Sequence, residues 1–461
     1  MRTRILKWCS TLAVSSFCFC LFLTATAHAE VYEKTLKNGL KVIVREDRRA
    51  PVIVQQIWYR AGSMDENIGT TGIAHVLEHM MFKGTKSIPA GQFSKRIAAA
   101  GGRENAFTSS DYTAYFQQLH ESKLRLAMQL ESDRMRNLKL SKTEFDKEVQ
   151  VVMEERRMRT DDEPRALLYE QLLATIYLSH PYRNPVIGWM NDLQALQVSD
   201  AQTWYNNWYA PNNAVLVIAG DVNAKEVFAL AQRYYGAIPA RTLPPRRNIS
   251  DPAQVGVKRI VVKAPAQLPN ILMAYHAPTL RDPEAEWKPY ALQILAGVLD
   301  GNESARLNKA LVREQQLASS VGVSYDAISR GPSQFLLEGT PSEGKTVADL
   351  EAGLRAQIAL LVSDGVSEEE LKRVKAQVTA SEVYKLDSLF YQAMQIGQLE
   401  SSGMSHLAIP LMLKKLQAVT AQQVQDVARE FIQDDQLTVA VLDPQPLSGK
   451  PVARKGAAHA H

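Results

Sequence analysis

The chain has 461 residues, of which 46% are hydrophobic and 22% are charged. This length suits two or three domains, and the composition excludes a disordered chain, a collagen-like repeat and a small disulfide-stapled protein. The 53 basic and 49 acidic residues give a net charge of +4. So even a balance gives no indication of an extended nucleic-acid-binding surface or a polybasic membrane patch.

Residues 1–29 have the pattern of a secretory signal peptide. Three basic residues lie within the first seven positions, an apolar run follows over 8–23, and Ala27-His28-Ala29 forms a small-x-small cleavage site. The run is shorter than the roughly 20 residues that span a bilayer, which disfavours an uncleaved anchor. We therefore predict cleavage before Glu30 and a periplasmic location.

The cysteines all lie in this leading segment, at Cys9, Cys18 and Cys20. A mature chain without cysteine forms no disulfides, so its hydrophobic core must supply the stability. No later segment is long and apolar enough to cross a bilayer. We therefore expect no stable membrane insertion after cleavage.

The first half of the mature chain alternates predicted strands and helices. Asn38-Gly39, between apolar segments 31–36 and 40–44, predicts a hairpin with a type I′ turn. The next expected elements are a strand over 52–59, a helix that carries His75 and His79 and ends at Gly84, a strand over 114–119, long amphipathic helices, a strand over 215–219 and a helix from Ala224. The aromatic residues at helical spacing between 204 and 209 are predicted to form a core stripe.

The pattern of the first half returns near the end of the chain. Segment 198–202 resembles 419–423, and segment 215–221 resembles 437–443. The two pairs have nearly the same offset, which is close to half of the chain and too long for a solenoid repeat. Duplication of a whole domain explains this better than chance similarity. We predict an α+β protein with two similar α/β-sandwich domains, each with an antiparallel-rich sheet flanked by helices.

The predicted boundaries follow from composition. A first domain is expected over 30–240, a Pro- and Arg-containing linker over 241–256, a second, similar domain over 257–445, and a flexible tail over 446–461.

The most informative motif is His75-Val76-Leu77-Glu78-His79. On a helix, residues i and i+4 share a face, so both imidazoles can bind one ion while Glu78 lies at the adjacent edge. Two histidines and a distant carboxylate leave a fourth zinc position open, as hydrolysis requires, and a nearby Glu can act as general base. The order is the inverse of the common zincin motif. We predict one Zn²⁺ per chain, bound by the domain over 30–240, and no metal site in the domain over 257–445.

A third ligand is expected from the helix that follows Ser141, where Ser141-x-x-Glu144 forms a capping box. In that register Glu148 and Glu155 lie on the apolar face, whereas Glu154 points away. Buried carboxylates are costly unless they form ion pairs or bind metal. Both possibilities remain, because Arg156 also falls on this side.

These residues resemble the pitrilysin family, which includes insulin-degrading enzyme and the mitochondrial processing peptidases. The separation of His79 from Glu155, with Glu148 two helical turns before Glu155, is as in that family. Further similar segments occur at 102–108, 112–115, 180–188 and 218–221. The length is similar to one subunit of the short, dimeric bacterial branch.

The resemblance implies a role for each matching residue. Zinc ligands would be His75, His79 and Glu155, with Glu78 as general base and Glu148 as a supporting carboxylate. An extended substrate would add as a strand to the backbone of Asn105, Ala106, Phe107 and Thr108.

One segment departs from the family pattern. The family carries an Arg and a nearby Tyr in the second half of a unit, and here Arg313 is present but Ser319 or Ser320 takes the Tyr position. A serine hydroxyl is too short to replace a phenol. Our hypothesis is a heterodimer in which a related partner supplies the Arg/Tyr pair, and the alternative is a homodimer that functions without the Tyr.

Together these features predict an exported zinc endopeptidase that cleaves extended peptides or unfolded segments, without a nucleic-acid partner. The alternatives are a non-catalytic scaffold or assembly subunit of the same fold, and a zinc carrier, in which Glu78 would have no purpose. His120, His276 and His406 are isolated from acidic clusters in the sequence, so we expect packing or surface roles for them.

Overall fold

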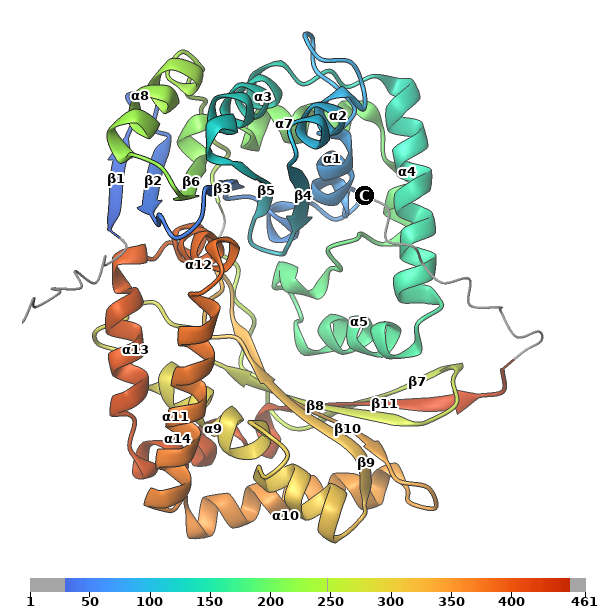
Figure 1. The fold of residues 1–461 in the computed structure, drawn as a ribbon. Helices are drawn as coiled ribbons and strands as arrows, with labels where there is room; N and C mark the ends of the chain where they lie inside the picture. The colour runs from blue at the N-terminus through green and yellow to red at the C-terminus, as the bar shows by residue number, and fades with distance from the viewer. Residues whose placement is uncertain (1–29, 247, 448–461) are drawn as a thin grey trace, which may run out of the picture.

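The computed structural model describes residues 30–246 and 248–447. The predicted signal peptide with its cysteines, and nearly all of the predicted tail, lie outside the described residues. Figure 1 shows the chain as two sheet-containing halves joined by the segment between α8 and β7. Apart from residue 247, which is not described, 241–256 contains no helix or strand.

The first sheet has six strands in the order β1-β2-β6-β3-β5-β4. Only the β2–β6 pair is parallel. Central strand β6 is buried along its whole length, which explains why its sequence is a continuous apolar run. The strand bounds are β1 Val31–Thr35, β2 Lys41–Glu46, β3 Val52–Tyr59, β4 Arg103–Thr108, β5 Thr113–His120 and β6 Ala214–Gly220.

The second sheet repeats this topology in the order β7-β11-β8-β10-β9, with β7–β11 as its parallel pair. Strands β2, β6, β3, β5 and β4 correspond in order to β7, β11, β8, β10 and β9. This correspondence confirms the prediction of two similar α/β halves. The strand bounds are β7 Lys258–Pro265, β8 Asn270–Ala277, β9 Ala318–Tyr325, β10 Ser333–Pro341 and β11 Leu437–Gln445.

Helices cover one face of each sheet and form the two main cores. The helices of the first half are α1 Ile73–Met80, α2 Gln92–Ala99, α3 Leu124–Asn137, α4 Lys142–Arg156, α6 Met190–Ala195, α7 Val198–Trp208 and α8 Ala224–Tyr235. Those of the second half are α9 Lys288–Asp300, α10 Val347–Asp364, α11 Glu368–Lys385, α13 Ile409–Ala418 and α14 Ala421–Phe431. None of the helices in the described part of the chain is long and apolar enough to span a membrane.

One helix from each half covers the sheet of the other half (Figure 1). Helix α5 (Pro164–Ile176) packs Leu168 and Leu172 against β8 and β11 of the second sheet. Helix α12 (Leu389–Ser402) packs against β3 and β6 of the first sheet. Gly397 of α12 lies so close to Trp58 that an added Cβ would overlap the indole. The two halves therefore share core packing.

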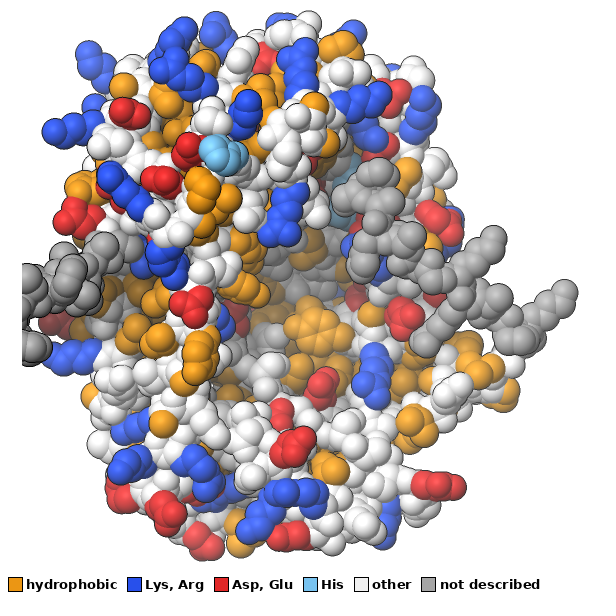
Figure 2. Space-filling view, viewed as in Figure 1, with side chains coloured by type: hydrophobic (Ala, Val, Ile, Leu, Met, Phe, Trp, Pro, Cys, Tyr) orange, Lys and Arg blue, Asp and Glu red, His pale blue; other side chains and the backbone are white. Residues whose placement is uncertain are grey.

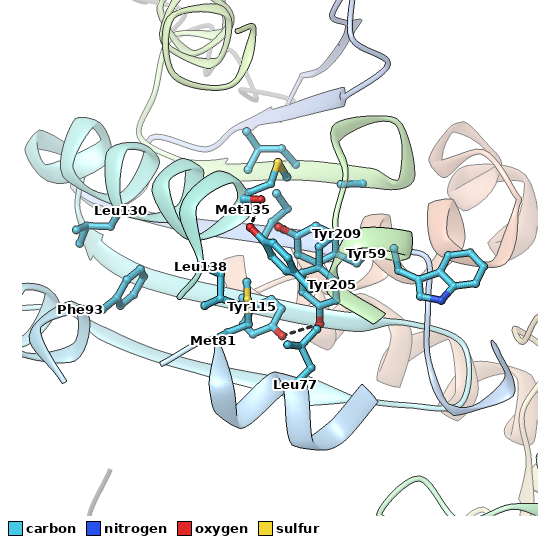
Figure 3. Packing of buried hydrophobic residues seen from close by; sticks show 14 of the residues in the cluster. Tyr59, Leu77, Met81, Phe93, Tyr115, Leu130, Met135, Leu138, Tyr205 and Tyr209 are labelled. Carbon is cyan, nitrogen blue, oxygen red and sulfur yellow. Dashed lines mark hydrogen bonds between the residues drawn. The ribbon is translucent and has the colours of Figure 1, made fainter. Parts of the chain in front are cut away.

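A cluster of tyrosines packs between α1 and the first sheet and fixes the helix there (Figure 3). The hydroxyls of Tyr115 on β5 and Tyr209 lie 2.8 Å apart, and Tyr205 donates to the Met135 carbonyl at 2.6 Å. Leu77 of α1 packs in the same cluster. The predicted aromatic stripe over 204–209 is thus confirmed as core.

The prediction that α1 ends at Gly84 is wrong, because the helix stops at Met80. A turn follows in which the Lys83 N–H donates to the Met80 carbonyl. Gly84 has a φ of 99° in the next loop, where an added Cβ would lie 2.7 Å from Ala90 N. The glycine therefore serves a tight loop and not the end of the helix.

Candidate metal centre

The helix that carries the His-x-x-Glu-His motif is held at its N-terminus by a buried carboxylate. Glu66 accepts hydrogen bonds from Gly72 N and Ala74 N, both at 2.8 Å. Gly72 has a φ of 87°, and an added Cβ would lie 2.7 Å from the Ile187 carbonyl oxygen. Asp192 accepts from Gly69 N, Thr71 N and the Thr71 hydroxyl. The start of α1 is therefore fixed by side chains distant in sequence.

Helix α1 presents both motif histidines to α4. The rings of His75 and His79 lie 4.9 Å apart between centroids. Glu155 Oε2 lies 3.9 Å from His75 Nε2 and 3.6 Å from His79 Nε2. The other oxygen of Glu155 forms an ion pair with Arg159. One carboxylate oxygen and two imidazole nitrogens thus face a common point.

This donor set fits a zinc ion. Tetrahedral zinc with ligand distances of about 2.0–2.2 Å separates its ligand atoms by about 3.3–3.6 Å. The three ligand atoms lie within 4.8 Å of one another, so small side-chain movements would bring all three onto one ion. Burial, together with nearby His79 and Arg159, lowers the pKa of His75 to about 3. The imidazole is therefore neutral at ordinary pH, as metal binding requires.

A second carboxylate orients His79. Its Nδ1 lies 3.2 Å from Glu148 Oε2, and Lys83 contacts the other oxygen of Glu148 at 2.7 Å. Burial raises the pKa of Glu148, but these two hydrogen bonds outweigh it and leave the pKa below its ordinary value. An ionised Glu148 that accepts Nδ1–H leaves the Nε2 lone pair of His79 toward Glu155 and the common point.

Glu78 lies beside this group and points to the end of β4. Its Oε2 accepts a hydrogen bond from the Thr108 hydroxyl. Burial raises the pKa of Glu78, while the bond from Thr108 and the proximity of His79 oppose that rise. A general base must accept a proton and later return it, and a carboxylate whose pKa is raised toward the working pH can do both.

The other predicted substrate residues lie along β4, an edge strand that pairs only with β5 among the described strands. Asn105 is exposed, and its side-chain oxygen accepts the Ala106 N–H at 2.8 Å. Phe107 packs against Trp58 and Tyr112 on the opposite side of the strand from Thr108. The free edge ends beside Glu78. Figure 2 shows this face hollowed between the two halves, with hydrophobic side chains gathered in the hollow.

Arg313 belongs to the second half of the chain, whereas the residues of the metal centre all belong to the first half. It is exposed in a short helical segment, Asn308–Glu314, directly before edge strand β9, and within the described residues it forms no ion pair or hydrogen bond. Ser319 and Ser320 are exposed on β9 itself. The structure therefore does not join Arg313 to the histidines through any contact.

The helix register predicted for α4 is confirmed. Ser141 caps the helix by accepting the Glu144 N–H, and Glu148 is buried while Glu154 is exposed. Arg156 does not form the ion pair with Glu148 or Glu155 that the sequence left open. Its guanidinium donates to Glu170 at 2.7 and 2.9 Å and also contacts Asp161. Arg156 therefore leaves both site carboxylates available.

Four residues around the centre were not expected from the sequence: Glu66, Asp192, Lys83 and Arg159. Arg159 lies four residues after Glu155 in the helical segment that continues α4, so helical spacing could have indicated it. Lys83 lies beyond the end of α1, where helical spacing no longer applies. Glu66 and Asp192 act through loop backbone, and no spacing rule points to them.

His406 corrects another prediction, because it does not stand apart from acidic residues. It is buried, and its Nδ1 lies 2.8 Å from Glu400. Glu33 completes a second cluster with metal-ligand spacing. Lys41 contacts both carboxylates at 2.9 Å, so a lysine ammonium already provides the cation there.

Comparison with known proteins identifies the family of this chain. Residues 41–189 match the family model for Insulinase (Peptidase family M16), and residues 195–378 match the Peptidase M16 inactive domain. The Zinc protease PqqE of Helicobacter pylori is 33% identical over 443 residues, covering 92% of this chain and 96% of that protein.

Solved structures show the same fold. A protease from Helicobacter pylori superposes with a TM-score of 0.86 at 30% identity, covering 90% of this chain and 100% of that chain. The first half of the periplasmic protease PqqL from Escherichia coli has a TM-score of 0.76 at 20% identity, covering 89% of this chain and 91% of that one. The predicted family resemblance is confirmed, and the chain belongs to peptidase family M16, the insulinase family.

Proposed function

We propose that this protein is an exported zinc endopeptidase that cleaves extended peptides or unfolded segments. The observation that carries the proposal is the convergence of His75, His79 and Glu155 on one point with Glu78 beside it. A scaffold subunit has no need to keep two histidines and two carboxylates in this costly buried arrangement.

In this proposal His75, His79 and Glu155 hold the zinc. When bound, zinc supplies Lewis acidity that polarises the scissile carbonyl and lowers the pKa of a water molecule. Glu78 accepts the proton of the attacking water and then donates it to the leaving amine. Thr108 holds one oxygen of Glu78, and Glu148 fixes the orientation of His79.

The free edge of β4 suits a substrate in extended conformation. Added as a strand, the substrate would form backbone hydrogen bonds that depend little on its sequence. It would displace the Asn105 side chain from the Ala106 N–H. Because β4 ends at Thr108, such a strand would reach Glu78.

The experiment measures hydrolysis of a quenched-fluorescent peptide library by the zinc-loaded mature chain. Chelator should abolish cleavage, and Glu78→Gln should abolish turnover with zinc still bound. Glu154→Gln is the matched control, since that carboxylate is exposed on the neighbouring helix. Full turnover by Glu78→Gln would refute its role, and bound zinc with no cleavage by the wild-type chain would favour the scaffold alternative or a missing partner.

The proposal includes a dimer in which this chain supplies the metal-binding half. Arg313 is exposed beside edge strand β9, while the serines at 319 and 320 cannot supply a phenol. We propose a related partner subunit that carries an Arg/Tyr pair. Light scattering of the purified chain, with peptide turnover measured on the same sample, tests this: a homodimer that cleaves at full rate would contradict it.

The proposed location is the periplasm. It rests on the signal-peptide pattern of residues 1–29, and a structural relative is a periplasmic protease. Cell fractionation followed by N-terminal sequencing should find the protein in the periplasmic fraction, beginning at Glu30. A chain that keeps its first residues in the cytoplasmic fraction would contradict it.

A further inference from the structure

Basic side chains gather where the two halves and the connecting segment meet. They line a cavity of about 460 Å³, which we call the junction cavity. Lys41 comes from β2, Arg60 follows β3, Arg246 belongs to the connecting segment, and Arg330 lies between β9 and β10. The remaining wall is formed by residues 400–405 at the end of α12. All three parts of the chain thus contribute to one cavity.

Two buried carboxylates, Asp65 and Glu400, each contact two of these four cations. Asp65 accepts from Arg330 at 2.7 and 2.9 Å, and lies 3.8 Å from Arg246 Nε. Glu400 contacts Lys41 at 2.9 Å and Arg60 at 3.6 Å. Only Glu400 among the carboxylates lines the cavity itself.

The outer partners of these cations lie away from the cavity wall. Asp111 accepts the Arg330 backbone N–H and the Tyr182 hydroxyl, and burial raises its pKa. Glu33, the further partner of Lys41, is half exposed. Neither carboxylate therefore supplies negative charge at the cavity wall.

The charges that line the junction cavity do not balance. Burial raises the pKa of Glu400, but hydrogen bonds from His406 and Lys41 lower it to about 2, so Glu400 is ionised. Arg60 Nε donates to the Glu400 backbone carbonyl at 3.0 Å. Within the described residues, however, the carboxylate contacts of Arg60 and Arg246 are long, and each is with a carboxylate that binds another cation more closely. Positive charge is therefore in excess at this wall, and an anion is the expected occupant of such a site.

Arg246 is the cation with the weakest pairing. Its guanidinium donates to the Arg60 carbonyl and to Asn213 Oδ1, and stacks over Trp208 at 5.0 Å from the ring centroid. Burial and the neighbouring Arg330 lower the pKa of Arg246 to about 10. Burial is the larger cause, and the nearby positive charge of Arg330 and Arg60 is the smaller one, which a bound anion would offset.

A hydroxyl in the same wall also has no partner. Ser401 is 2% exposed, and its Oγ forms no hydrogen bond with the described residues. Ser402 and Ser405 line the junction cavity beside it. Hydroxyl donors next to guanidinium groups are a common way to bind oxyanions.

We propose that the junction cavity binds a phosphate-class oxyanion. Guanidinium groups match the oxygens of phosphate in pairs, and a phosphate monoester carries about −1.5 to −2 charges at pH 7, which suits the excess of cations. The cavity volume falls in the range of about 300–1,000 Å³ that holds small ligands. Because its walls come from both halves, the anion braces the junction between them.

The test is calorimetric titration of the full mature chain with inorganic phosphate, at an ionic strength held constant with potassium chloride. Wild type should show saturable binding at one site, and Arg246→Gln should weaken it at least tenfold. Arg48→Gln is the matched control, since Arg48 is 63% exposed and, in the part of the chain that the structure describes, pairs only with Glu46. No saturable binding by wild type, or equal binding by Arg246→Gln, would overturn the proposal.

Two further variants serve as controls. One shows whether phosphate binds at the junction cavity or at the metal centre, and the other shows whether a loss of binding comes from misfolding. Phosphate could bind at the metal centre, so His79→Ala must retain the phosphate affinity of wild type; loss of binding in His79→Ala alone would overturn the proposal. If circular dichroism shows that Arg246→Gln is unfolded, Lys41→Gln replaces it and should weaken binding in the same direction. Acetate, which carries one charge, should bind at least tenfold more weakly than phosphate.

Discussion

Replacement of Glu66 tests how the start of α1 supports the metal centre. The Glu66 carboxylate accepts Gly72 N–H and Ala74 N–H, both at 2.8 Å. Glutamine keeps one acceptor oxygen and turns its amide N–H group toward the other backbone donor. A buried N–H without an acceptor costs about 1–3 kcal/mol, so we expect Glu66→Gln to cost about 2 kcal/mol at this helix start.

Part of that cost should appear as lost zinc affinity. His75 directly follows the capped Ala74 and His79 lies one turn further, so a loosened helix start must be rebuilt when zinc binds. At 1.4 kcal/mol per factor of ten, the full cost of about 2 kcal/mol would correspond to roughly 30-fold weaker binding, which is the upper limit of the expected loss. Titration of the metal-free chain with zinc against a competing chelator dye measures this.

The matched control is Glu226→Gln, which changes an exposed carboxylate in the first turn of α8. Zinc affinity in this variant should equal that of wild type. If Glu66→Gln lowers the melting temperature but leaves zinc affinity within threefold of wild type, Glu66 stabilises the fold without positioning the histidines. Such a result would contradict the proposed link between the helix start and the metal centre.

Three other predictions test separate parts of the structure. Thr108→Val should lower kcat about tenfold, because it removes the hydroxyl that holds Glu78, and should leave zinc affinity unchanged. Thr108→Ser, which keeps the hydroxyl, should restore turnover. Equal kcat in Thr108→Val and wild type would contradict this. Gly397→Ala should lower the free energy of unfolding in urea by about 1–3 kcal/mol, because its Cβ overlaps Trp58. A change within error would show that α12 adjusts freely. Glu400 has its pKa lowered to about 2, so its stabilising effect is present above pH 4.5 and is lost as the pH falls. The difference in unfolding free energy between wild type and Glu400→Gln should therefore shrink by about 1 kcal/mol from pH 7 to pH 4, and a pH-independent difference would contradict the lowered pKa.

The sequence predicted the parts of the site that depend on helical spacing. His75 and His79 share a face because they lie one turn apart, and the cap at Ser141 set the register that buries Glu148 and exposes Glu154. The repeat of the strand-and-helix pattern likewise predicted two sheets of the same topology.

Contacts between elements distant in sequence could not be predicted in this way. Arg156 shares the apolar side of α4, yet its partner Glu170 lies on α5, which crosses to the second sheet. His406 meets Glu400 only because the chain turns back after α12. Periodicity gives the face of a helix but not the element that will cover it, so these partners required the fold.

Zinc titration of the metal-free mature chain, beside Glu155→Gln and Glu154→Gln, is the decisive measurement for the metal centre. These neighbouring residues on α4 differ in direction: Glu155 faces the two histidines, whereas Glu154 is exposed. Wild type and Glu154→Gln should bind one zinc per chain with equal affinity, and Glu155→Gln should bind it at least 100-fold more weakly. Unchanged zinc affinity in Glu155→Gln would contradict a centre formed by His75, His79 and Glu155.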